Sequence, residues 1–94
     1  MGRKQRERPE KLAEKLLTIR QALGFSQTQM WRALGLEEKS SYHIISYFEN
    51  GKQEPSILDL LRYARLAHIS LEILADDEQE LPVRITKKKK VPRE

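Results

Sequence analysis

Residue types that carry out covalent or metal-dependent chemistry are scarce in this sequence. There is no cysteine, which excludes a disulfide scaffold, a thiolate metal site and a cysteine nucleophile. The two histidines, His43 and His68, lack the spacing of metal ligands. Paired carboxylates, a nucleophile beside a base, and a glycine-rich phosphate loop are also absent at useful spacings. We therefore expect that the protein is not an enzyme and that it uses no metal or other cofactor.

Positive charge is concentrated at the two ends of the chain. The net charge is +4, while the segment between the ends is mildly acidic. Basic arms favour a polyanionic partner such as nucleic acid, because Lys and Arg neutralise phosphates and release counterions. The alternative is that the ends stay charged because nothing buries them, and charge alone leaves both interpretations open. The basic residues are Arg3, Lys4, Arg6 and Arg8 in the N-terminal arm and Lys87, Lys88, Lys89 and Lys90 in the C-terminal tail.

Apolar spacing and capping residues predict five short helices that must position any site. Leucine and isoleucine recur at helical spacing in the first helix, and Gly24 can end it with a positive φ. Ser26 with Gln29 has the spacing of a capping box at the start of the second helix. Ser41, Ser56 and Ser70 are the expected caps of the later three. The expected helices are residues 9–23, 27–34, 42–49, 57–67 and a short one from residue 71.

The length of 94 residues favours one small domain. We expect a basic N-terminal arm over 1–8, a domain over 9–81 and a basic tail over 82–94. Within the tail, residues 83–86 alternate apolar and polar side chains, which weakly indicates a strand. Residues 76–78 are expected to form a solvated acidic patch. No apolar run approaches the ~18 residues of a membrane span, and no apolar signal segment follows the N-terminus, so a cytoplasmic protein without membrane contact is expected.

The segment from residue 19 to residue 75 carries a recognisable set of motifs. The block Glu49-Asn50-Gly51-Lys52, followed by Pro55-Ser56, comes after a helix start at Ser26-Gln27. On these residues the chain resembles the XRE-type helix-turn-helix family, which includes phage repressors and restriction–modification controllers. The resemblance implies an all-α, compact five-helix lambda-repressor-like DNA-binding domain, here with basic N- and C-terminal arms. Further matching residues are Arg20, Leu23-Gly24-Phe25, Leu34-Gly35-Leu36, Ile45-Ser46, Phe48 and Ile69-Ser70-Leu71.

The resemblance makes the third helix the recognition helix, which enters the major groove of double-stranded DNA. A tyrosine ring suits thymine methyl groups, and a histidine can donate to a guanine acceptor. Arg20 and Glu49 match a structural ion pair between the first and third helices. Gln27 and Asn50 have plainer alternatives, as a solvent-exposed helix start and a helix stop. Base contacts are expected from Tyr42, His43, Ser46 and Tyr47, and phosphate contacts from Ser26, Gln27, Ser41, Asn50 and Lys52.

Two features depart from the family pattern. The turn between Gly35 and Ile45 is longer than usual, and Trp31 stands where the family has a small alanine. The indole can fill space that the longer turn opens. Alternatively, the two together can tilt the third helix away from the usual docking angle. The fold tolerates either outcome, but the assignment of individual base contacts depends on which one holds.

These features predict a nucleoid-associated, sequence-specific transcriptional regulator. We expect a repressor that binds an inverted repeat as a homodimer, because one such module contacts only a few base pairs. The fifth helix and the segment to Leu81 are the expected dimer surface. The alternative is an antitoxin or adaptor whose main role is to bind a partner protein, with its basic tail ordering on an acidic surface. Genetic context and co-purification distinguish the two.

Overall fold

A computed structural model of the chain describes residues 8–86, and all regular structure in this range is helical. The all-α prediction is confirmed for these residues. Six helices follow one another without an intervening strand in the described range. They are α1 (Leu12–Leu23), α2 (Gln27–Ala33), α3 (His43–Glu49), α4 (Ile57–Ala67), α5 (Leu71–Ala75) and α6 (Val83–Thr86).

Local sequence signals set several of the helix ends. Ser26 Oγ accepts the Gln29 N–H at 3.0 Å, and Gln29 Oε1 accepts the Ser26 N–H at 2.7 Å, which is the expected capping box. Ser56 Oγ accepts the Asp59 N–H at the start of α4. Gly24 ends α1 in the left-handed region, with φ 76°. These three predictions are confirmed.

The start of α1 differs from the prediction, because the helix begins at Leu12 and not at Pro9. The N–H groups of the two residues that precede the helix are bound by a residue far away in the sequence. Asp77 Oδ2 accepts the Glu10 N–H at 2.8 Å, and Oδ1 accepts the Lys11 N–H at 3.0 Å. These two bonds lower the pKa of the Asp77 carboxyl group. Asp77 therefore caps the start of α1 while it remains partly exposed, so the expected acidic patch also has a structural role at this residue.

The prediction of a weak strand at residues 83–86 was also wrong, because this segment forms the single helical turn α6. Ile85 and the preceding Leu81 are buried in the core, and α6 contacts α1. The Arg84 guanidinium donates to the Ala67 and His68 carbonyls at the end of α4, at 3.1 and 2.5 Å. Packing against the core thus extends to Ile85 in the described range.

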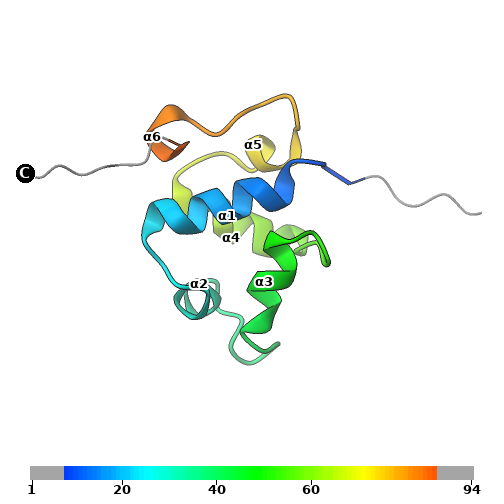
Figure 1. Cartoon of the computed structure of the whole chain (residues 1–94), viewed down its shortest axis with the longest axis vertical. Coiled ribbons are helices and arrows are strands. Elements are labelled where there is room, and N and C mark those ends of the chain that lie inside the picture. Colours follow the sequence, from blue (N-terminus) through cyan, green and yellow to red (C-terminus); the bar gives the residue numbers. More distant parts are fainter. Residues whose placement is uncertain (1–7, 87–94) are drawn as a thin grey trace, which may run out of the picture.

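Helices α1 and α4 occupy the middle of the molecule, with α2 and α3 on one side and α5 and α6 on the other (Figure 1). Helix α1 contacts α3, α4, α5 and α6, and α2 contacts α3. Every helix contributes to one shared core. The buried apolar residues are Leu12, Leu16, Ile19, Met30, Leu34, Leu36, Ile45, Phe48, Leu60, Tyr63, Ala64, Ala67, Leu74, Leu81 and Ile85.

Lys15 is a buried charged residue of α1, with 6% of its surface exposed. Its ammonium group donates to the carbonyl oxygens of Ile73, Asp76 and Gln79, at 2.6, 3.0 and 2.8 Å. All three of its N–H groups are therefore used. Burial lowers the pKa of Lys15, and the nearby carboxylates of Asp77 and Asp76 oppose that shift. Lys15 fastens α1 to α5 and to the turn that follows it.

Candidate functional site

Helix α3 presents a polar and aromatic face to solvent. Ile45 and Phe48 turn inward and are buried, as predicted. On the other side, Tyr42 and Tyr47 are 47% and 42% exposed, and His43 is also exposed. Ser46 lies between these rings and is half-buried. The four expected base-reading residues thus share one side of α3, since residues four apart are neighbours on a helix.

The end of α3 is tied to α1 through Glu49. Arg20 Nε and Nη2 donate to the two Glu49 carboxylate oxygens at 2.6 and 3.1 Å. Arg20 Nη1 also donates to the Phe25 carbonyl at 2.9 Å, in the turn before α2. Both charged side chains are largely buried, with 16% and 6% of their surfaces exposed. The structure brings Arg20 and Glu49 together in the pairing that the resemblance implied, in a planar two-bond geometry.

Gln27 joins the same network from the start of α2. Its Nε2 donates to Glu49 Oε1 at 3.1 Å, and the side chain is half-buried. The amide therefore braces α2 against the end of α3. Gln27 is not the solvent-exposed helix-start residue of the plainer interpretation. Its contact with a phosphate remains a prediction.

The turn after α3 gathers three of the other expected contacts. Asn50 Oδ1 accepts the Lys52 N–H at 3.0 Å, and Gly51 has φ 81°, a conformation that favours glycine. Lys52 is exposed. Arg8 Nη1 donates to the Gly51 carbonyl at 3.2 Å, so the last residue of the expected N-terminal arm reaches this turn. The other arm residues, Arg3, Lys4, Arg6, Lys87, Lys88, Lys89 and Lys90, lie outside the described residues.

Ser26 and Ser41 are both exposed, and each bonds a backbone N–H of its own helix start. Ser41 Oγ accepts the His43 N–H at 3.3 Å, so it serves α3 although Tyr42 occupies the cap position. Ser70 holds the cap position of α5 but makes no side-chain cap bond there. Ser26 thus lies at the start of α2, and Ser41 lies at the start of α3.

Tyr63 lies beneath this network and is fully buried. Among residues 8–86 its hydroxyl group has no hydrogen-bond partner. Burial and the nearby Glu49 carboxylate raise the pKa of Tyr63. The hydroxyl group therefore stays protonated, and the negative charge at this point belongs to Glu49.

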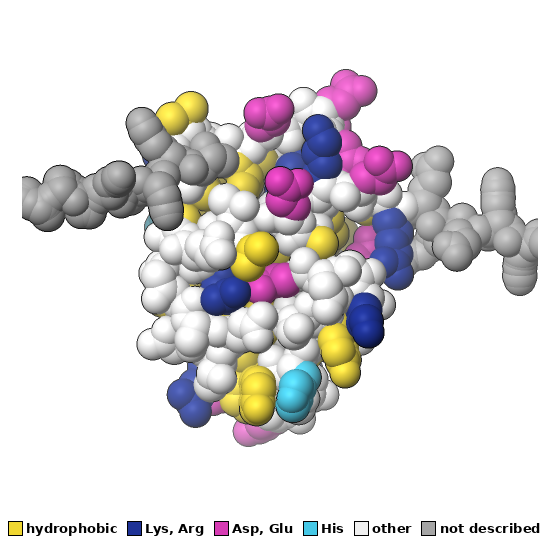
Figure 2. Space-filling view, in the orientation of Figure 1, with side chains coloured by type: hydrophobic (Ala, Val, Ile, Leu, Met, Phe, Trp, Pro, Cys, Tyr) yellow, Lys and Arg dark blue, Asp and Glu magenta, His cyan; other side chains and the backbone are white. Residues whose placement is uncertain are grey.

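Charge is unevenly distributed over the surface. In the view of Figure 2, acidic side chains gather at the end where α5 and the following loop lie. The opposite end, formed by α2 and α3, shows histidine, hydrophobic and basic side chains and fewer acidic ones. On the face that Figure 2 shows, acidic side chains are thus more frequent at the α5 end than at the α2–α3 end.

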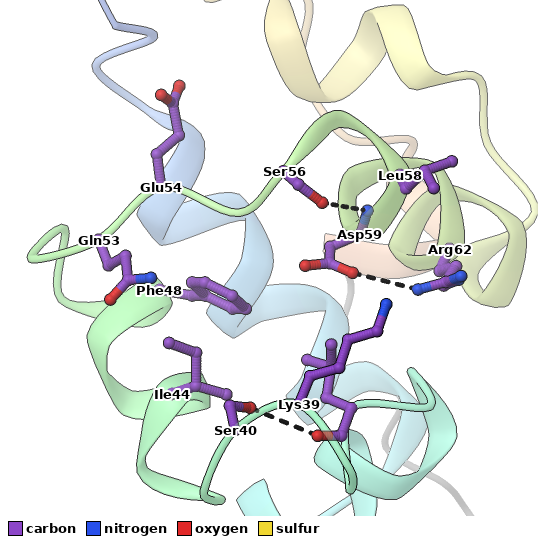
Figure 3. A pocket seen from close by; sticks show the side chains of 11 residues that line it. Lys39, Ser40, Ile44, Phe48, Gln53, Glu54, Ser56, Leu58, Asp59 and Arg62 are labelled. Carbon is purple, nitrogen blue, oxygen red and sulfur yellow. Dashed lines mark hydrogen bonds and ion pairs between the residues drawn. The ribbon is translucent and has the colours of Figure 1, made fainter.

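A groove of about 450 Å³ runs between the α2–α3 turn, α3 and α4. Ile44 and Phe48 line it from α3, and Asp59 and Arg62, which form an ion pair, line it from α4 (Figure 3). Leu58, in the first turn of α4, lies at its edge and is 54% exposed. No local sequence pattern indicates this groove, because the residues that line it come from three segments that only the fold brings together.

Within residues 8–86 no helix is long and apolar enough to cross a membrane. The same residues contain no cluster of three or more His, Asp or Glu side chains able to hold a metal ion. His68 is the residue that ends α4, as expected for a helix-end histidine.

The chain matches no protein-family model, no curated protein and no solved structure to which it was compared.

Proposed function

We propose that this chain is a sequence-specific transcriptional regulator of double-stranded DNA, a repressor with a lambda-repressor-like fold. The observation that supports this most is the exposed face of α3, which is held at a fixed angle by the Arg20–Glu49–Gln27 network. A helix that reads base edges must be oriented by its neighbours before it enters the major groove. Here three side chains from α1, α2 and α3 do so within one set of hydrogen bonds.

Base readout is assigned to Tyr42, His43, Ser46 and Tyr47. For His43, the nitrogen that carries the ring hydrogen depends on the direction of its contact with Ser41. Ser41 Oγ accepts the His43 N–H and also lies 3.3 Å from His43 Nδ1. When the serine O–H donates to Nδ1, the ring hydrogen resides on Nε2. The exposed Nε2–H then suits the O6 or N7 acceptor of guanine.

Phosphate contacts fall on both sides of this face. Ser26 and Gln27 lie at the start of α2, Ser41 at the start of α3, and Asn50 and Lys52 at its end. Arg8, the one described residue of the expected N-terminal arm, lies at the same edge through its bond to the Gly51 carbonyl. These groups fix the position of the protein on the duplex without reading sequence. They explain how a mildly acidic domain binds a polyanion.

The proposed inverted repeat requires a two-fold dimer. Within the segment 71–81, the expected dimer surface, Leu74 and Leu81 are buried in the protein's own core, and Leu71 and Ile73 are only partly exposed. Ile57 and Leu58, in the first turn of α4, are 70% and 54% exposed, and they adjoin the groove beside α3. We therefore assign the dimer contact to this face of α4.

Sedimentation of the purified protein tests the dimer assignment. Replacing Ile57 and Leu58 with Lys is expected to convert dimers to monomers. The control is Val83→Lys, because Val83 is 69% exposed and lies on α6. A wild-type chain that stays monomeric even with DNA would contradict the assignment and favour the antitoxin or adaptor alternative, with a partner protein in the groove.

Selection of bound fragments from random duplex DNA tests the function itself. The full-length protein is used at about 150 mM salt, where purely electrostatic binding is weakened. Enrichment of an inverted repeat is the expected result. Binding without enrichment would restrict the function to non-specific phosphate contact, and no binding would contradict the proposal.

A further inference from the structure

Three aromatic side chains contact one another in a row from α2 to the start of α3. We call this row, Trp31, Tyr42 and His43, the stack. The Trp31 indole, half-buried on α2, meets the Tyr42 ring edge-on, with centroids 6.3 Å apart and planes at 76°. The Tyr42 ring lies nearly parallel to the His43 imidazole, at 4.4 Å and 22°. Tyr42 and His43 are both exposed. The stack therefore begins against the core and ends on the face assigned to base readout.

The long turn between α2 and α3 is fastened to the same indole. Trp31 Nε1 donates to the Ser40 carbonyl at 3.2 Å, and the Ser40 N–H donates to the carbonyl of the buried Leu36 at 3.1 Å. These two bonds hold Ser40 in place at the end of the turn, two residues before Tyr42. Trp31 and the longer turn accommodate each other, as the first of the two interpretations of the sequence predicts.

The stack does more than fill space. A ring that only fills the core is covered on all sides, as Phe48 is at 3% exposure. Tyr42 is 47% exposed. Its ring nevertheless makes an edge-on contact with the Trp31 indole and stacks on the His43 imidazole. Orienting an exposed side chain before binding reduces the rotamer entropy that is lost on binding. The exposed part of the stack is therefore ready to receive a flat or methyl-bearing apolar group.

We propose that Trp31 is a positioning residue that orients the Tyr42 and His43 rings before DNA binds. The two rings then form an apolar surface for thymine methyl groups in the major groove. This inference rests on the function proposed above. Tyr42 and His43 contact the duplex, while Trp31 acts through them. The C5 methyl of thymine is the apolar group that base pairs present in the major groove. The preferred ligand is thus a duplex with a thymine opposite the start of α3.

The test uses the duplex that the wild-type protein selects, with each thymine replaced in turn by deoxyuridine. This change removes the methyl group and leaves the hydrogen-bonding edge intact. Affinity is expected to fall about fourfold at one thymine in each half-site, which is the effect of one buried methylene-sized group. A selected site without thymine, or one in which no replacement weakens binding, would overturn the inference.

Variants then test the role of Trp31 through the ratio of affinities for the thymine and deoxyuridine duplexes. Trp31→Leu is expected to bring this ratio near one, and Arg32→Leu, at an exposed position of the same helix, is expected to preserve it. A merely structural Trp31 would weaken binding to both duplexes by the same factor and leave the ratio unchanged, which would overturn the inference. Should Trp31→Leu fail to fold, Trp31→Met keeps a long apolar side chain but loses both the ring and the bond to Ser40, and an unchanged ratio there has the same meaning.

The proposed function and the proposed role of Trp31 are overturned by different results. A wild-type protein that enriches no sequence overturns the proposed function together with this inference. A protein that enriches a site but is indifferent to its thymine methyl groups overturns the inference alone.

Discussion

The Arg20 guanidinium of α1 holds the Glu49 carboxylate of α3 through two parallel hydrogen bonds, at 2.6 and 3.1 Å. The two residues are 29 positions apart in the chain, and both side chains are largely withdrawn from solvent. A pair in such surroundings contributes mainly to orientation, since desolvation offsets much of its attraction. Its consequence is that α3 cannot rotate about its own axis without separating the pair.

Removing one partner of this pair is expected to cost more than removing both. Glu49→Ala leaves the Arg20 charge unpaired and lowers the free energy of unfolding by about 3 kcal/mol. The double variant Arg20→Met with Glu49→Leu is expected to be less destabilised than Glu49→Ala alone, because it leaves no unpaired charge in the site. Urea denaturation followed by circular dichroism gives these free energies.

The exposed pair Arg32–Glu37 is the matched control. Its atoms lie 3.6 Å apart, and its side chains are 61% and 50% exposed. Glu37→Ala is expected to change the stability by less than about 0.5 kcal/mol. Equal effects of Glu49→Ala and Glu37→Ala would show that burial of the Arg20–Glu49 pair has no energetic consequence.

Lys15→Met is expected to destabilise the protein by about 2 kcal/mol or more, because three backbone carbonyl groups lose a charged donor inside the fold. Hydrogen exchange is the second measurement, since the amides of α5 are expected to lose protection before those of α3. The control is Lys11→Met, which changes an exposed lysine one turn earlier. A Lys15→Met protein with unchanged stability would mean that water replaces the ammonium group without cost.

Asp77→Asn is expected to lower the thermal midpoint above pH 4 and to have little effect at lower pH. The backbone N–H groups of Glu10 and Lys11 hold the pKa of Asp77 below its ordinary value of 3.8. A carboxyl group with a lowered folded pKa adds stability above its unfolded pKa and loses it as the pH falls through the folded one. Melting curves across pH 2–7 therefore converge for wild type and variant at the acid end.

Glu78→Gln is the control for this experiment, because Glu78 is the exposed neighbour of Asp77. Its melting curves are expected to follow those of the wild type throughout. If Asp77→Asn and Glu78→Gln behaved alike, the cap that Asp77 provides to α1 would not contribute to stability.

His68→Gly is expected to stabilise the protein by about 1 kcal/mol. His68 has φ 58°, and it is the one non-glycine residue with positive φ within residues 8–86. This left-handed conformation costs about 1–2 kcal/mol for most side chains and suits the glycine that usually follows a helix. His68→Val is expected to destabilise, because a β-branched residue tolerates this conformation least. Thermal melts in which the glycine variant is the less stable would contradict this account.

The features that the sequence predicted correctly are those that depend on neighbouring residues. Ser26 with Gln29, Ser56 with Asp59, and Gly24 are such local signals, because cap and helix lie within a few positions of each other. The buried faces of α1 and α3 followed from helical spacing for the same reason. The pairing of Arg20 with Glu49 came from the family resemblance, since spacing alone does not indicate it.

The features that were missed depend on contacts between distant segments. Asp77 caps α1 across more than 60 positions, and no local pattern indicates such a bond. Lys15 offered one signal, because it lies three residues after Leu12 and four before Ile19, within the apolar stripe. Residues 83–86 were too few for their period to distinguish a strand from a helical turn. Only Ile85 of this segment's two aliphatic side chains is buried, and Val83 is exposed.

In the proposed complex, the outward face of α3 reads bases while the turn after it contacts phosphate. Affinities of Tyr47→Ala and Lys52→Ala for the selected duplex and for its single-base variants separate these two roles. Tyr47→Ala is expected to remove the preference at one base position, whereas Lys52→Ala weakens binding to every duplex alike and reduces the salt slope by about one. If both variants weakened binding to all duplexes by the same factor, α3 would not read sequence, and the account would be contradicted.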